Sequence, residues 1–405
     1  MIKNFTLLSC CVGILFLLGC APSEMEKEKQ STRQFSVQEY EAFGKRIAEK
    51  VNKRHSDTLN QLFDLEYMLE KMTNQLQKNQ YQKITQEIIF KENFKKKVNP
   101  SSFIIKELRK GYGRYQFLRF HPRQGVPHLL FRMTSEEGIN YHDYEVRIID
   151  NELRLTDLFV FLSGEYLSET LKGTFINLLS QQKQQKIIEP ELDEQLGNIQ
   201  KLKQAIDRHD YEEALQFYNS LSIKTQKSKT FMSYKLLITS NISYEMHQKA
   251  IAEYEKLFPD DPSHYLMDIE KYLLQGDAKN ILWSVDKLDR TIGGDEYLNL
   301  YRGLVYSITE DKEKGLTLVN NYIRNNVKDP DGYWMRFQIH VILDEPEEAI
   351  KTINDINQYT MHSRMFITEK VEKNFPDFAA SSHFMNWKED WTKQHNARNR
   401  WRADQ

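Results

Sequence analysis

Apolar residues in the first third of the chain recur at the three- and four-residue spacing of an amphipathic helix. Phe43, Ile47 and Val51 lie four positions apart, which places them on one face of a helix. The same spacing continues in a second group further along: Leu62, Leu65, Met68, Leu69 and Met72. The pattern therefore predicts helices from Gln38 to about Lys97.

Between Phe103 and Phe161 the apolar positions alternate with a period of two, which is typical of strands. The pair Asp150-Asn151 fits a two-residue hairpin turn between the two longest strands. The predicted strands are 116–121, 128–133, 139–149 and 152–162, with turns that contain Gly or Pro at 122–127 and 137–138. Helices followed by strands predict an α+β domain with a curved antiparallel sheet over residues 36–190.

From about Leu192 onward only the helical spacing remains, and the pattern repeats. The first residue of a small-apolar pair recurs at positions 214, 250, 281, 315 and 349, so the intervals are 36, 31, 34 and 34 residues. A period near 34 residues is that of helix–turn–helix repeats. The small side chains among them (Ala214, Ala250, Gly315 and Ala349) permit close approach of two helices. We therefore expect an all-α helical solenoid over residues 191–361.

The last segment, residues 362–405, is rich in aromatic and large apolar side chains. They are Phe366, Val371, Phe375, Phe378, Phe384, Trp387 and Trp391. Because a repeat array needs a closing element at its end, we expect a helical cap here that ends in a solvated tail. The alternative is a partner-binding hot spot, since tryptophan and tyrosine dominate such sites.

The amino terminus has the form of a secretory signal. Lys3 precedes an apolar run from Phe5 to Leu18, which is shorter than the roughly 20 residues that span a bilayer. The run ends in Leu17-Leu18-Gly19-Cys20, which resembles the lipobox of bacterial lipoproteins. The resemblance implies a signal peptide at 1–19, cleavage before Cys20 and acylation of its thiol. An ordinary signal peptide or an uncleaved helix is the alternative.

Acylation of Cys20 would anchor the protein in the bacterial cell envelope through a flexible tether at 20–35. Each methylene buried in the bilayer contributes about 0.8 kcal/mol to membrane binding. Several acyl chains, palmitate among them, would therefore hold the protein stably in the membrane. In the resembling family, Ala21 rather than aspartate after the cysteine favours the outer membrane facing the periplasm. Acidic residues in the tether leave surface exposure open. All three cysteines lie in this segment (Cys10, Cys11 and Cys20).

The composition excludes some classes of protein, but it does not indicate a particular activity. Of 405 residues, 40% are hydrophobic and 12% aromatic, and the net charge is −2, which excludes a disordered chain. A pI near 6.6 argues against nucleic-acid binding, which needs a basic excess. Gly-rich phosphate loops, nucleophile elbows and zinc-binding His or Cys motifs do not occur, and His121 and His128 do not meet a recognised metal spacing. We therefore expect no metal and no cofactor.

The hairpin at 139–162 offers one cluster of polar side chains. With Ile149 facing Glu152 across the turn, Tyr144 lies opposite Asp157, and His142 shares the same otherwise apolar face. An imidazole and a carboxylate there can orient one another for general-base catalysis, or line a ligand pocket. A hydrogen-bonded core cluster is the favoured interpretation, because a buried aspartate must be hydrogen-bonded in any case.

The repeat motifs resemble those of tetratricopeptide repeats. Asp210-Tyr211-Glu212-Glu213-Ala214-Leu215 opens a second helix as in that family, and Pro259, Pro262 and Pro330 lie where its inter-repeat prolines fall. The resemblance implies a groove, lined by the first helices, that binds peptides or proteins. The corresponding residues in this chain are Tyr234, Tyr265, Tyr301, Arg302, Tyr333 and Arg336. The α+β domain resembles the cone-shaped nuclear-transport-factor-like fold.

These features predict a monomeric, membrane-anchored envelope lipoprotein that acts as a scaffold or adaptor for an envelope protein or peptide. We expect recognition through the helical repeats rather than enzymatic turnover. Two alternatives remain open. One is a lipoprotein that binds a small molecule or glycan in a pocket of the α+β domain. The other, less favoured, is an enzyme that uses His142 and Asp157.

Overall fold

The computed structural model describes most of the chain between Arg33 and Asp390. The described residues are 33–54, 56–73, 100–109, 112–135, 138–170, 190–259, 261, 264–309 and 311–390. The predicted signal peptide, Cys20 and most of the tether lie outside them, as do the later part of the first helical prediction and the terminal tail. Among the helices described, none combines the length and the apolar character needed to cross a bilayer.

Helices precede the sheet, as the sequence predicts. The first begins with a reciprocal cap: the Glu39 N–H donates to Ser36 Oγ at 3.3 Å, and the Ser36 N–H donates to Glu39 Oε2 at 2.9 Å. Its apolar face buries Phe43, Ile47 and Val51, so the helical prediction is confirmed there. The described helices before the sheet are α1 (Val37–Asn52), α2 (Ser56–Leu62), α3 (Leu65–Thr73) and α6 (Pro100–Arg109).

Five strands form one antiparallel sheet in which each strand pairs with the next along the chain. They are β1 (Arg114–Arg123), β2 (Val126–Ser135), β3 (Gly138–Ile149), β4 (Glu152–Val160) and β5 (Glu165–Tyr166). Asp150 and Asn151 both have positive φ, at 51° and 63°, as a two-residue hairpin turn requires. The turn before β2 is tighter than predicted, because Pro122 pairs with Pro127 and only 124–125 turn.

The register of β3 and β4 differs from the prediction beyond the fourth pair. From Ile149–Glu152 to Val146–Leu155 the pairing is as predicted. A β-bulge then shifts the ladder, so Tyr144 faces Leu158 and not Asp157. The cause is one extra residue, Thr156, whose Oγ1 lies 3.2 Å from Glu145 Oε1. A shift of one position moves every later side chain to the other face of the sheet.

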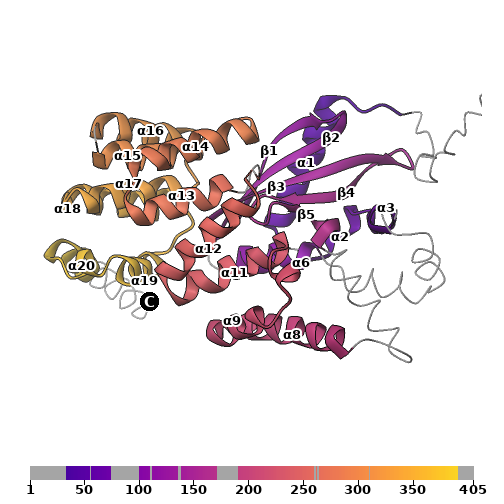
Figure 1. The fold of residues 1–405 in the computed structure, drawn as a ribbon. Helices are drawn as coiled ribbons and strands as arrows, with labels where there is room; N and C mark the ends of the chain where they lie inside the picture. Colours follow the sequence, from indigo (N-terminus) through magenta and orange to yellow (C-terminus); the bar gives the residue numbers. More distant parts are fainter. Residues whose placement is uncertain are drawn as a thin grey trace, which may run out of the picture.

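The two faces of the sheet are covered by different parts of the chain (Figure 1). The first face, which carries Leu129, Phe131 and Tyr144, packs against α1, α2, α3 and α6. The second face, which carries Leu130 and Tyr141, packs against helices from the carboxy-terminal half. The sheet is therefore a layer shared between the helices that precede it and those that follow it.

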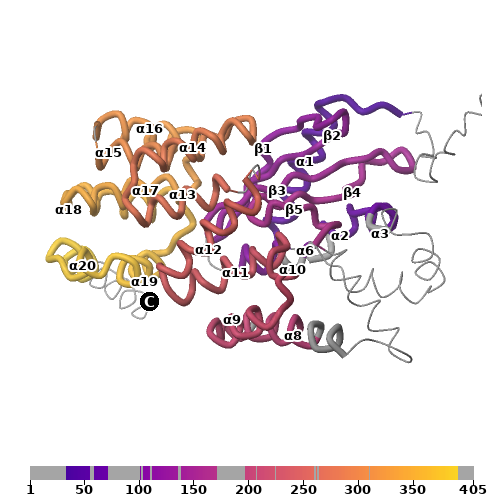
Figure 2. The backbone as a smooth tube through the Cα atoms, viewed as in Figure 1, coloured from indigo at the N-terminus to yellow at the C-terminus, as the bar shows by residue number. Residues whose placement is uncertain are grey.

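Only helices follow the sheet in the described residues, and they pack mainly as hairpins (Figure 2). The hairpins are α8 (Pro190–Asp207) with α9 (Tyr211–Asn219), α11 (Lys229–Ile242) with α12 (Tyr244–Leu257), α13 (His264–Gln275) with α14 (Ala278–Ile292), α15 (Leu298–Thr309) with α16 (Lys312–Asn325), and α17 (Pro330–Ile342) with α18 (Pro346–Tyr359). A short helix, α10 (Ile223–Gln226), precedes α11. An α+β region followed by a helical region is thus confirmed.

The repeated residues at 214, 250, 281, 315 and 349 all lie on the second helix of a hairpin, and all are buried. At Gly315 the two helices pack closely, because a Cβ there would lie 2.5 Å from the backbone oxygen of Gly303 on the facing helix. Several second helices also begin with the same cap: Asp210, Asp277 and Asp311 accept a hydrogen bond from the backbone three residues later.

Aromatic residues near the end of the described chain pack on the last hairpin. The segment contains α19 (Arg364–Asn374), α20 (Pro376–Ala379) and a helix at 382–390. The Phe337 ring on α17 lies 5.1 Å from Phe375 and 5.2 Å from Phe378. The Trp387 indole N–H donates to Asn354 at 2.8 Å. These side chains are therefore engaged within the chain, whereas Trp391 and Trp401 lie outside the described residues.

Candidate functional site

The predicted cluster of His142, Tyr144 and Asp157 does not converge. His142 and Tyr144 lie on the first face, where the Tyr115 hydroxyl links them at 2.9 Å to His142 Nδ1 and 2.9 Å to Tyr144 Oη. All three rings are fully buried, and burial lowers the pKa of His142 to about 3. Asp157 lies on the second face because of the bulge. His142 and Asp157 are therefore separated by the sheet and cannot orient one another.

Asp157 instead belongs to an ion pair on the second face. Lys71 of α3 places its ammonium 2.8 Å from Asp157 and 2.8 Å from Glu145. Burial lowers the pKa of Lys71, but the two carboxylates outweigh burial and raise it. The Ser168 hydroxyl also donates a hydrogen bond to Asp157 Oδ2 at 2.6 Å. This pair fixes α3 at the edge of the sheet.

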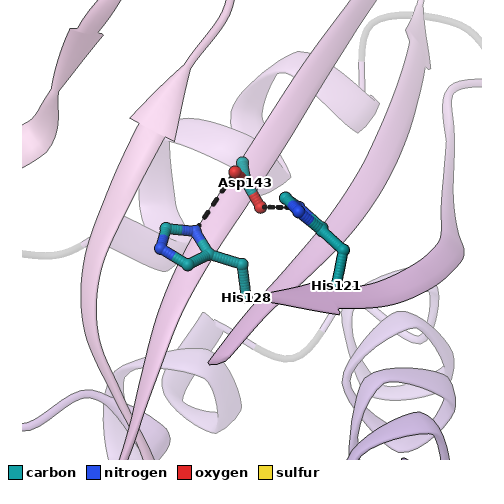
Figure 3. A group of neighbouring side chains, drawn as sticks. All are labelled: His121, His128 and Asp143. Carbon is teal, nitrogen blue, oxygen red and sulfur yellow. Dashed lines mark hydrogen bonds and ion pairs between the residues drawn. The ribbon is translucent and has the colours of Figure 1, made fainter. Parts of the chain in front are cut away.

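A second polar group on the same face joins three strands (Figure 3). His121 on β1 faces His128 on β2 directly, and Asp143 projects from β3 beside them. His121 Nε2 lies 3.0 Å from Asp143 Oδ1, and His128 Nδ1 lies 3.1 Å from Asp143 Oδ2. His128 and Asp143 are almost fully buried, whereas about a third of the His121 side chain, 33%, is exposed. We call these three residues the His–His–Asp triad.

Electrostatics keeps the Asp143 carboxylate ionised. Burial raises its pKa, but the hydrogen bonds from His121 and His128 outweigh burial, and the net pKa lies below the usual value. Within the described chain, the His–His–Asp triad is the group of three or more His, Cys, Asp or Glu side chains whose donor atoms lie close enough together to share one ion. An ionised carboxylate with two imidazoles can therefore act either as a hydrogen-bonded triad or as a set of metal ligands.

Sequence reasoning missed the triad because the turn before β2 is tighter than predicted. His121 and His128 are equidistant from the 124–125 turn, three residues on either side, and so pair directly. The Gln124-Gly125 dipeptide could have indicated this short turn, because a glycine in the second turn position favours a two-residue hairpin. The contribution of Asp143 depends on the pairing of a third strand, which the spacing of the histidines does not show.

The residues predicted to line a groove are spread over several environments. Tyr333 is buried in the core of the last hairpins, and Tyr301 packs between two cores. Arg302 pairs with Asp286 and Asp289. Tyr234 and Tyr265 are half-buried.

Arg336 lies in a shallow depression of about 300 Å³, where it pairs with Asp355 and donates to Asn320. The depression lies between α16, α17 and α18 and is lined mainly by charged and polar side chains.

Exposed aliphatic side chains recur at one position of the helical hairpins. Leu274, Ile308 and Ile342 lie at the ends of α13, α15 and α17, at intervals of 34 residues. They are 59%, 42% and 50% exposed. Large exposed apolar side chains are common singly, but these three share the repeat period. They therefore lie at equivalent positions of three consecutive hairpins, and we call these three residues the aliphatic edge.

Comparison with models of known protein families, with curated proteins and with solved structures gave no match to this chain. The residues and geometry of the chain itself therefore carry the functional argument.

Proposed function

We propose that this protein is a lipid-anchored scaffold of the bacterial cell envelope, whose helical hairpins bind a partner protein. The ending Leu17-Leu18-Gly19-Cys20 supports the anchor through its resemblance to a lipobox. The period of about 34 residues and the packing of helices in hairpins support a tetratricopeptide-like repeat array. Arrays of this type use extended surfaces to bind other proteins.

The observation that carries the proposal is the aliphatic edge. In a repeat array, equivalent positions of successive hairpins stack along a common edge, and in such an array Leu274, Ile308 and Ile342 would form a row of exposed aliphatic side chains. Burying exposed apolar area stabilises a complex by roughly 25 cal/mol per Å². A partner segment with apolar side chains, extended or helical, fits a row of this kind. The tyrosines predicted from the sequence contribute less, because Tyr333 and Tyr301 are engaged in cores.

Site-specific photocrosslinking in the native host tests this function. A photoreactive side chain at position 308 of the acylated protein is expected to crosslink one envelope protein. The double substitution Leu274→Ser and Ile342→Ser, made in the same background, is expected to abolish that crosslink by removing the flanking contacts.

The matched control places serines at two exposed aliphatic positions off the edge, Val37→Ser and Ile223→Ser, which are 50% and 69% exposed. The crosslink is expected to persist in this control. A crosslink that survives loss of the aliphatic edge, or that disappears equally in both double variants, contradicts binding at that edge.

The anchor has its own test at Cys20. The substitution Cys20→Ser removes the thiol that acylation requires, so the protein is expected to lose labelled palmitate and to leave the membrane fraction. The substitution Cys11→Ser serves as a matched control, because Cys11 lies within the predicted signal and carries no acyl chain in this scheme. Unchanged membrane association of the Cys20→Ser protein contradicts lipid anchoring through this residue.

A further inference from the structure

The second face of the sheet carries surfaces of two kinds. Near the hairpins it is apolar, with Leu130, Tyr141 and Phe159 packed against α13, α14 and α15. Further along the strands it is polar and includes the His–His–Asp triad.

We propose that His121, His128 and Asp143 bind a divalent transition-metal ion. Two imidazole nitrogens and one carboxylate form a donor set that suits zinc, iron, cobalt and nickel ions. Magnesium and calcium prefer sites made wholly of oxygen ligands, so this triad favours the transition metals. Within the described chain, these are the residues whose possible ligand atoms come together, all within 4.8 Å of one another.

The distances in the triad are close to those of a coordinated set. Ligand atoms about 2.0–2.2 Å from a common tetrahedral ion lie roughly 3.3–3.6 Å from one another. His121 Nε2 and His128 Nδ1 are already 3.0 and 3.1 Å from the two oxygens of Asp143. Three neighbouring strands carry the side chains, and strands hold a site more rigidly than loops do. Small side-chain movements would therefore bring the donors around an ion.

Charge supplies a second, independent argument. A buried carboxylate needs a compensating positive charge, and Glu145 and Asp157 on the same face share the ammonium of Lys71. Within the described chain, the ion-pair partners of Asp143 are the two histidines. A bound divalent ion would place positive charge directly beside this buried carboxylate.

The exposure of His121 indicates how an ion would enter. His128 and Asp143 are buried, so the side of the triad that carries His121 is the one that faces solvent. Zinc sites with three protein ligands keep a further coordination position for water or another ligand. In this site such a position would lie on the side of His121. The site is thus of the open kind rather than a closed structural one.

Metal titration of the full-length acylated protein tests the proposal. The protein is purified in detergent without a polyhistidine tag and treated with a chelator, then titrated with Zn²⁺ by calorimetry and with Co²⁺ by visible absorption. We expect a single ion per chain and Co²⁺ bands typical of nitrogen and oxygen ligands. Loss of one ligand in His121→Ala is expected to weaken Zn²⁺ binding by at least about tenfold.

His121→Ala is the decisive variant because His121 is partly exposed and its loss leaves the core intact, whereas Asp143→Asn changes a buried group. A circular dichroism spectrum equal to that of the wild type verifies that the variant folds. The matched control is His383→Ala, which removes an exposed histidine on the helix at 382–390 and is expected to bind Zn²⁺ like the wild type. Absence of Zn²⁺ and Co²⁺ binding in the wild type, or equal Zn²⁺ affinity in wild type and His121→Ala, overturns the proposal and leaves a hydrogen-bonded triad.

Discussion

His142 illustrates how a polar side chain becomes part of a core. Its ring is fully buried, and Nδ1 lies 2.9 Å from the Tyr115 hydroxyl, which in turn lies 2.9 Å from the Tyr144 hydroxyl. The Asn140 amide approaches Nε2 at 3.3 Å. Both ring nitrogens therefore have neutral partners, and in the part of the chain that the structure describes no carboxylate is placed to stabilise the imidazolium. Burial disfavours the charged form and lowers the pKa of His142 to about 3.

The depressed pKa of His142 predicts a loss of stability in acid. Below pH 6.5 the unfolded chain takes up a proton at His142, while the folded chain does so only near pH 3. The free energy of unfolding therefore falls as pH drops from 6.5 towards 3, by up to roughly 4 kcal/mol for this residue. Thermal unfolding of His142→Gln between pH 7 and 4 is expected to show a shallower pH dependence. The matched control is His383→Gln, which changes an exposed histidine. If the stability of His142→Gln depends on pH as steeply as that of the control, the prediction for His142 is contradicted.

At the scale of elements, much of the fold follows from local pattern. Period-two alternation locates the four long strands, Asp150-Asn151 locates a turn, and the 34-residue spacing locates the second helix of each hairpin. The bulge does not follow, because one extra residue at Thr156 leaves no mark in a segment that already mixes polar and apolar side chains. The pairing of His121 with His128 depends on the length of a turn, and the role of Asp143 depends on a third strand.

The hairpin of α15 and α16 depends on the absence of a side chain at Gly315. A Cβ there would lie 2.1 Å from Ser307 Oγ and 2.5 Å from the backbone atoms Gly303 O and Ser307 N. Because backbone cannot yield as a flexible side chain can, Gly315→Ala is expected to destabilise the protein by about 1–3 kcal/mol.

The matched control is Gly197→Ala on α8, where a Cβ meets nothing within 4 Å. Alanine is the better helix former by about 1 kcal/mol, so this control is expected to be neutral or stabilising. Urea unfolding of both variants measures the difference, and equal midpoints would argue against the close packing at Gly315.

On the scale of the whole molecule, the sheet and the hairpins share an interface. The pattern of apolar and polar residues along the sequence does not reveal this interface. Arg132 of β2 pairs with Asp295 at the start of the α15 region, and both side chains are buried. The Tyr141 hydroxyl also donates to Asp295 at 2.9 Å, while Arg114 pairs with Asp331 at 2.6 Å. A chain cut after Pro190 would expose the apolar second face and leave Arg132 without its partner. The helical region therefore contributes to the stability of the sheet.

This interface predicts that the two regions unfold together. Asp295→Asn keeps the shape of the side chain but leaves the buried Arg132 guanidinium without a counter-charge, which is expected to cost about 3–5 kcal/mol. Tryptophan fluorescence reports on the helical region, because all five tryptophans lie at or beyond Trp283. Hydrogen exchange of β2 and β3 amides reports on the sheet.

In urea, both probes are expected to show coincident transitions that Asp295→Asn shifts by the same free energy. The matched control is Asp286→Asn, an exposed partner of Arg302, which keeps Asp289 as a second partner. It is expected to change stability by less than about 0.5 kcal/mol. Separate transitions for the two probes, or a shift confined to fluorescence, would show that the sheet is stable without the hairpins. Coincident transitions would instead show that the sheet and the hairpins unfold as one cooperative unit. Any partner bound along the aliphatic edge would then stabilise the sheet and its His–His–Asp triad as well.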